Sequence, residues 1–179
     1  MNPQTIDDIY TANARIREKL KTTISGLTDE QAAKRAEDGK WTVAELVEHI
    51  SIVDESMTKI CAKLLNKAKA AGQAGDGSVS LSGDFIQRSM EVAGTKLEAP
   101  EFVRPTSSQT ISESLNRMDE SQKIMDDIRP LFESVDGTAQ KFPHPFFGEI
   151  SAHEWLSLRG GHEARHIKQI EKILADAEG

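Results

Sequence analysis

The sequence predicts an all-α fold, a four-helix bundle with short additional helices in its connections. Four long stretches carry apolar residues at the 3.6-residue spacing of an amphipathic helix, at about 5–25, 42–71, 110–130 and 151–177. The alternating β-branched runs that are typical of strands are hard to find. Each stretch can bury one face, as the helices of a bundle must.

Local signals mark the ends of these helices. A hydroxyl residue followed three positions later by glutamate forms a capping box, and one precedes each of the last three long helices: Thr42/Glu45, Thr110/Glu113 and Ser151/Glu154. Pro130 is predicted to kink or end the third helix. Residues 82–93 are predicted to form a brief helix, and 136–150 to be irregular. Gly160 and Gly161 lie at the back of the fourth apolar stripe, where they permit a close helix approach.

Composition limits the kind of protein. The length of 179 residues fits one domain, which we take as 1–179. The net charge of −7 disfavours binding to nucleic acid, since no basic stripe offsets it. A single cysteine, Cys61, excludes an internal disulfide and favours a reducing compartment. No signal peptide and no run of about 18 apolar residues is visible, so we expect a cytoplasmic protein without a membrane segment.

Three histidines occupy positions where a core should be apolar. His162 and His166 are four residues apart and share the face that carries Trp155, Leu158, Ile170 and Ile173. His49 lies on the flank of the second helix's stripe, whereas His153 points away from His162. Buried imidazoles need partners, and one divalent metal ion would satisfy all three and keep a coordination position open. The alternative is that they bond to side chains on other helices and hold no metal.

Two blocks of sequence resemble the DinB-like (DinB/YfiT) superfamily of metal-dependent four-helix-bundle proteins. The blocks are 39–50, with its tryptophan, threonine, glutamate and histidine, and 144–170, which closes with an HxxxHxxQ helix. The resemblance implies an up-down-down-up bundle and a frequent homodimer. It also implies a nickel or zinc ion on His49, His162 and His166. Some members of the superfamily are S-transferases or isomerases that use low-molecular-weight thiols.

Four further residues are candidates for the surroundings of the metal. Gln169 shares the stripe of the ligands and could donate a hydrogen bond to the site. Glu45 could orient His49, although its capping role competes, and we favour capping by about two to one. Arg159 could neutralise an anionic substrate, or send its head group to solvent or a carboxylate. His144 could overhang the metal, or serve only the turn around it.

Two classes of function follow from an open three-histidine site. In the first, the protein is an enzyme acting on a small molecule. The ion would then lower the pKa of bound water toward about 7, as in a hydrolase, or activate the thiolate of a thiol cosubstrate, as in a transferase. In the second, it is a non-catalytic metal- or ligand-binding protein of stress response or dimerisation. Three imidazoles accept several metals, and no general base is identifiable from spacing.

Overall fold

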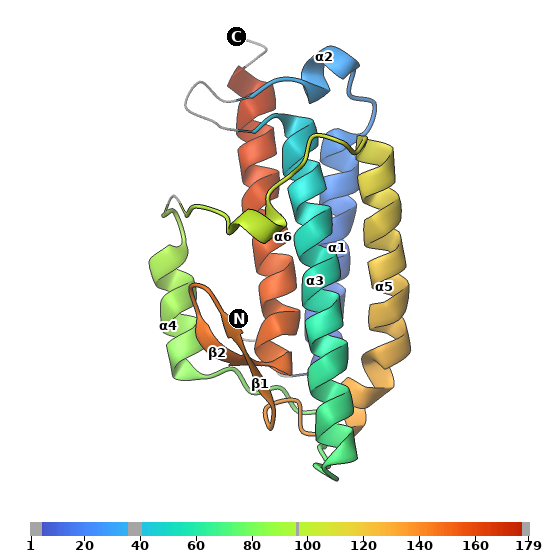
Figure 1. The fold of residues 1–179 in the computed structure, drawn as a ribbon, viewed down its shortest axis with the longest axis vertical. Helices are drawn as coiled ribbons and strands as arrows, with labels where there is room; N and C mark the ends of the chain where they lie inside the picture. The colour runs from blue at the N-terminus through green and yellow to red at the C-terminus, as the bar shows by residue number, and fades with distance from the viewer. Residues whose placement is uncertain (1–4, 36–40, 96, 177–179) are drawn as a thin grey trace.

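The computed structural model describes residues 5–35, 41–95 and 97–176. Its long helices form an elongated bundle: α1 (Ile6–Ile24), α3 (Val43–Ala70), α5 (Ile111–Ser134) and α6 (Ala152–Asp176). In Figure 1, α1 and α6 run upward while α3 and α5 run downward. This confirms the predicted four-helix bundle with its up-down-down-up order.

The connection between α3 and α5 explains the two consecutive downward helices. It returns the chain along the bundle through α4 (Gly83–Val92), which is the brief helix predicted at 82–93, and the 3₁₀ helix η1 (Glu101–Val103). A second short helix, α2 (Asp29–Ala32), joins α1 to α3. The long return places η1 against α3, near the middle of the bundle (Figure 1).

The prediction that residues 136–150 are irregular is wrong where the chain forms two short strands. β1 (Lys141–His144) and β2 (Gly148–Ser151) form an antiparallel hairpin in which Phe142 pairs with Ile150. Gly148, with φ of +71°, supplies the left-handed conformation at the start of β2. Burial of Ile150 explains the hairpin, since tertiary packing stabilises strands too short to be stable alone.

The predicted starts of the last three long helices are confirmed. All three capping boxes are present, and the hydroxyl of each capping residue accepts the backbone N–H three positions on. Pro130 does not end α5, which continues to Ser134, but Figure 1 shows the helix bending near its lower end. The bend is the expected result of a ring that clashes with the preceding turn.

The core consists of two hydrophobic clusters with charged residues between them. One cluster lies toward the hairpin, around Phe132 and Leu156, and the other lies toward the opposite end, around Leu20 and Ile50. The residues between them, which we call the polar layer, are Arg17, Asp54, Gln122, Arg159 and Glu163. No helix in the described ranges is long and apolar enough to cross a membrane.

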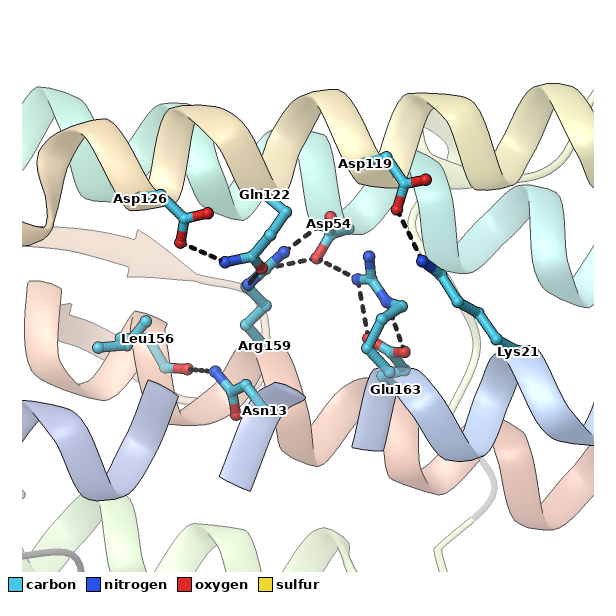
Figure 2. Close-up of polar contacts among 10 residues, drawn as sticks. Asn13, Lys21, Asp54, Asp119, Gln122, Asp126, Leu156, Arg159 and Glu163 are labelled. Carbon is cyan, nitrogen blue, oxygen red and sulfur yellow. Dashed lines mark hydrogen bonds and ion pairs between the residues drawn. The ribbon is translucent and has the colours of Figure 1, made fainter. Parts of the chain in front are cut away.

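The polar layer joins all four long helices (Figure 2). Arg17 of α1 binds both oxygens of Glu163 on α6, at 2.8 and 2.9 Å, and Asp54 of α3 at 3.1 Å. Arg159 of α6 binds the same Asp54 and donates to Gln122 of α5 at 2.9 Å. Two guanidinium groups and two carboxylates balance, so the layer buries no net charge.

The glycine pair permits close approach at one of its two positions. A Cβ on Gly160 would lie 2.1 Å from Oδ1 of Asn13 on α1, whereas one on Gly161 would meet nothing within 4 Å. The contact lets Asn13 donate to the Leu156 carbonyl at 3.0 Å. The prediction of close packing is therefore confirmed for Gly160 and wrong for Gly161.

Candidate metal centre

The structure brings the three predicted ligands together. His49 lies in the second turn of α3, and His162 and His166 lie one turn apart on α6. Nε2 of His162 is 3.2 Å from Nε2 of His49 and 3.1 Å from Nε2 of His166. One candidate ligand atom from each histidine lies within 4.8 Å of the others.

Hydrogen bonds behind the rings fix two of the tautomers. Nδ1 of His49 donates to the Val103 carbonyl at 2.7 Å, and Nδ1 of His166 donates to Oε1 of Gln169 at 2.6 Å. Each ring therefore presents an Nε2 lone pair to His162. A single proton on Nε2 of His162 can make a good hydrogen bond to only one of them, so a lone pair is left over.

A divalent cation fits this set of donors. Nitrogens about 2.0 Å from a tetrahedral ion lie about 3.3 Å apart, close to the two separations above. The rings are also in the right protonation state. Burial, more than any other cause, lowers the pKa of His49, lowers that of His162 well below its usual value, and lowers that of His166 to about 3. The three imidazoles are thus neutral at pH 7, as metal ligands must be.

Of the residues predicted around the metal, Gln169 contacts a candidate ligand and Glu45 does not. Gln169 bonds His166 through its oxygen, so it accepts a hydrogen bond where a donor was expected. The proposed contact of Glu45 with His49 is wrong. One Glu45 oxygen accepts from Thr42 N–H and the other from the Ser107 hydroxyl, so capping takes precedence.

Arg159 does not face the histidines, and the prediction that it meets a substrate is wrong. Its side chain is 4% exposed, and its guanidinium is held by Asp54 and Gln122 in the polar layer. An unpaired buried guanidinium would be costly, which explains why it takes the carboxylate. The alternative, a head group directed to a carboxylate, is the one observed.

His144 lies in β1 near the cluster. Its Nδ1 accepts from the Phe146 N–H at 3.1 Å, and its ring centroid is 5.2 Å from that of Trp155. Burial lowers its pKa to about 4. The neutral ring therefore carries its proton on Nε2, which has no hydrogen-bond partner among the residues that the structure describes.

Two contributors were missed by the sequence analysis. The Val103 carbonyl that orients His49 is a backbone atom, so no side-chain pattern could reveal it. Glu48, 1% exposed, accepts from the backbone and hydroxyl of Thr106 and from Ser107 N–H. No sequence signal marked Glu48, because its helical phase puts it opposite the apolar stripe of its helix and its burial appears only in the structure.

A cavity of about 560 Å³ lies near the cluster but does not reach it. Its walls come from α2, the first turns of α3 and α5, and the loop around Ser107. Glu48 borders the cavity, whereas none of the three histidines does. The ligand chemistry of the histidines, and not this hollow, therefore defines the candidate site.

Known proteins share the fold. The chain is 20% identical to YfiT from Bacillus subtilis, described as a probable metal-dependent hydrolase with an unusual four-helix bundle topology. That match has a TM-score of 0.63 and covers 96% of this chain and 87% of YfiT. The four-helix bundle protein TT2238 is 20% identical, with a TM-score of 0.60 and 93% and 98% coverage. At these identities, the likeness shows the fold.

Sequence comparison covers the same region. The uncharacterized protein YuaE of Bacillus subtilis is 21% identical over 160 residues, which is 87% of this chain and 90% of YuaE. The sequence pattern of the DinB superfamily matches residues 12–170, from α1 to the penultimate turns of α6. That range contains all three histidines and both blocks that carry the resemblance. The chain therefore belongs to the DinB superfamily.

Proposed function

We propose that this protein binds one divalent ion, zinc or nickel, through Nε2 of His49, His162 and His166, and hydrolyses a small molecule. The observation that carries the proposal is the convergence of three Nε2 atoms, two of them held as lone-pair donors by hydrogen bonds on Nδ1. The fold shared with YfiT, described as a probable metal-dependent hydrolase, favours hydrolysis.

Three protein ligands leave one coordination position of the ion for water or substrate. An ion held by the three histidines would supply a hydroxide at neutral pH. The chain's own residues orient and support this chemistry. Val103 and Gln169 hold two rings in the ligating tautomer. His144 stays neutral at pH 7 and keeps a proton on Nε2, from which it can donate to an oxygen of the substrate.

A thiol-dependent transferase is the second candidate. The acidic residues next to the ligands in sequence are both engaged, Glu48 with the 106–107 backbone and Glu163 with Arg17. Neither carboxylate is free to take a proton from water. A free thiol loses its proton at about pH 8.5 but binds metal as the thiolate, so, like a metal-bound water of pKa about 7, it needs no carboxylate base to become a nucleophile. The engaged carboxylates are therefore compatible with a low-molecular-weight thiol as cosubstrate.

The experiment compares metal-free, zinc-loaded and nickel-loaded protein on activated esters, amides and lactones, with and without added thiols. Hydrolase function predicts metal-dependent kcat/KM that His162→Ala abolishes and His153→Ala, on the same helix, preserves. Turnover only with a thiol would favour the transferase. A metal-loaded protein that turns over nothing in the panel would favour the non-catalytic alternative.

Three expectations stay predictions. These are a homodimer, a cytoplasmic location, and a single domain spanning 1–179. Light scattering coupled to gel filtration gives the oligomeric state directly, with and without added metal.

A further inference from the structure

His49 and Glu48, neighbours in α3, both bind the loop that leads from η1 to α5, and they bind it at two different places. His49 binds the Val103 carbonyl at 2.7 Å, at the start of the loop. Glu48 binds its far side, accepting from Thr106 N–H at 3.1 Å, the Thr106 hydroxyl at 2.7 Å and Ser107 N–H at 3.0 Å. The carboxylate is 1% exposed, so these donors replace the water it gave up.

The loop has little else to fix its course. Among the residues that the structure describes, no backbone–backbone hydrogen bond outside regular elements involves residues 105–109. Ser107 has φ of 59°, the left-handed region, and is the one non-glycine residue with positive φ in the described ranges. A serine adopts that conformation at a cost in free energy and keeps it only where its surroundings impose it. Glu48 imposes it through Ser107 N–H, and Glu45 adds a bond to the Ser107 hydroxyl.

We propose that Glu48 is a positioning residue for the metal centre: by fixing residues 106–107, it places the Val103 carbonyl against Nδ1 of His49. The inference rests on the proposed function. With the carbonyl in place, His49 keeps its proton on Nδ1 and directs the Nε2 lone pair toward the other two histidines. Without the carboxylate the loop relaxes, the carbonyl moves away, and His49 loses both its tautomer preference and its orientation.

Glu154 provides a matched control, because its setting is chemically the same. Its carboxylate is 2% exposed and accepts from Ser82 N–H at 2.9 Å, the Ser82 hydroxyl at 2.6 Å and Ser151 N–H at 2.7 Å. It too ties a connection to a long helix, but at the start of α6 and not at the histidines. Replacing either glutamate by glutamine should therefore lower stability by a similar amount. Only Glu48→Gln should alter metal binding.

The test measures zinc affinity by competition with a chromophoric chelator, and the visible spectrum of the cobalt(II)-loaded protein. We expect Glu48→Gln to bind zinc about tenfold more weakly than the parent and to change the cobalt bands. Glu154→Gln should keep the parent's zinc affinity and cobalt spectrum, while its melting temperature falls about as much as that of Glu48→Gln. Thr106→Val changes an exposed residue and removes one of the three hydrogen bonds to Glu48. It should also weaken zinc binding, so it provides a second test if Glu48→Gln does not fold.

The outcomes separate the inference from the function beneath it. If the parent binds zinc and Glu48→Gln binds it equally well with an unchanged cobalt spectrum, the positioning role is wrong and the metal site stands. If Glu154→Gln loses as much affinity as Glu48→Gln, the effect is general destabilisation and the role is again wrong. If the parent itself binds neither zinc nor cobalt, the proposed function fails and the positioning role fails with it.

Discussion

Replacing Asp54 by asparagine tests whether the polar layer holds the bundle together. Asp54 accepts from Nε and Nη2 of Arg159 at 2.5 and 3.2 Å, and from Arg17 at 3.1 Å. It is 3% exposed, so solvent cannot take its place. Asn keeps the shape and one acceptor but removes the charge, which leaves two guanidinium groups facing the single carboxylate of Glu163.

The expected cost is large for one residue. Removing one partner of a buried ion pair costs about 3–5 kcal/mol, and we take the lower end because asparagine still accepts a hydrogen bond. A loss of about 3 kcal/mol in the free energy of unfolding lowers Tm by about 10 °C in a protein of this size. Urea titration followed by circular dichroism, with a parallel thermal scan, measures both quantities.

Asp119→Asn is the matched control. Asp119 pairs with Lys21 at 3.1 Å on the surface beside the layer (Figure 2), with side chains 51% and 37% exposed. Such pairs contribute less than about 1 kcal/mol, so this variant should unfold nearly as the parent does. Equal unfolding free energies for Asp54→Asn and Asp119→Asn would refute the account of the layer as a buried, interlocked network.

Three more outcomes are expected. Gln169→Leu removes the acceptor behind His166 and should weaken zinc binding about 10–100-fold in a chelator competition; unchanged affinity would contradict the tautomer assignment. His144 has a pKa of about 4 in the fold and about 6.5 when unfolded, so the unfolded chain binds more protons between these values. The unfolding free energy of the metal-free protein should therefore fall as the pH drops from 6.5 to 4, and it should fall less steeply in His144→Phe. Equal pH slopes for the two proteins in urea titrations would contradict the buried, neutral His144. Gly160→Ala should cost about 1–3 kcal/mol because the new methyl meets α1, whereas Gly161→Ala should be neutral or stabilising by thermal scan; the reverse order would exclude the packing described.

The sequence predicted what depends on local chemistry and periodicity. The stripes and capping boxes gave the four long helices, and the i,i+4 spacing of His162 and His166 put both rings on one face. The hairpin at 141–151 was missed because each of its strands has only four residues. In addition, β1 contains Pro143, and a proline argues against a strand. Their stability comes from packing on the bundle, which no local pattern records.

The surroundings of the histidines were harder to predict, because they depend on contacts between distant segments. Arg159 shares α6 with His162 and His166, yet Asp54 across the bundle draws its guanidinium into the polar layer. The Val103 carbonyl reaches His49 only through a loop 54 residues away in sequence. Helical phase fixes the face that a residue occupies, but not which distant partner competes for its polar atoms.

Metal content is the most direct test of the central claim. The protein is purified without a histidine tag, incubated with zinc or nickel, and analysed for metal by elemental analysis beside a His162→Ala/His166→Ala double variant. The account predicts about one equivalent of zinc or nickel in the parent and loss of that metal in the variant. No metal in the parent after incubation with both ions would contradict the site, and the three histidines would then be structural.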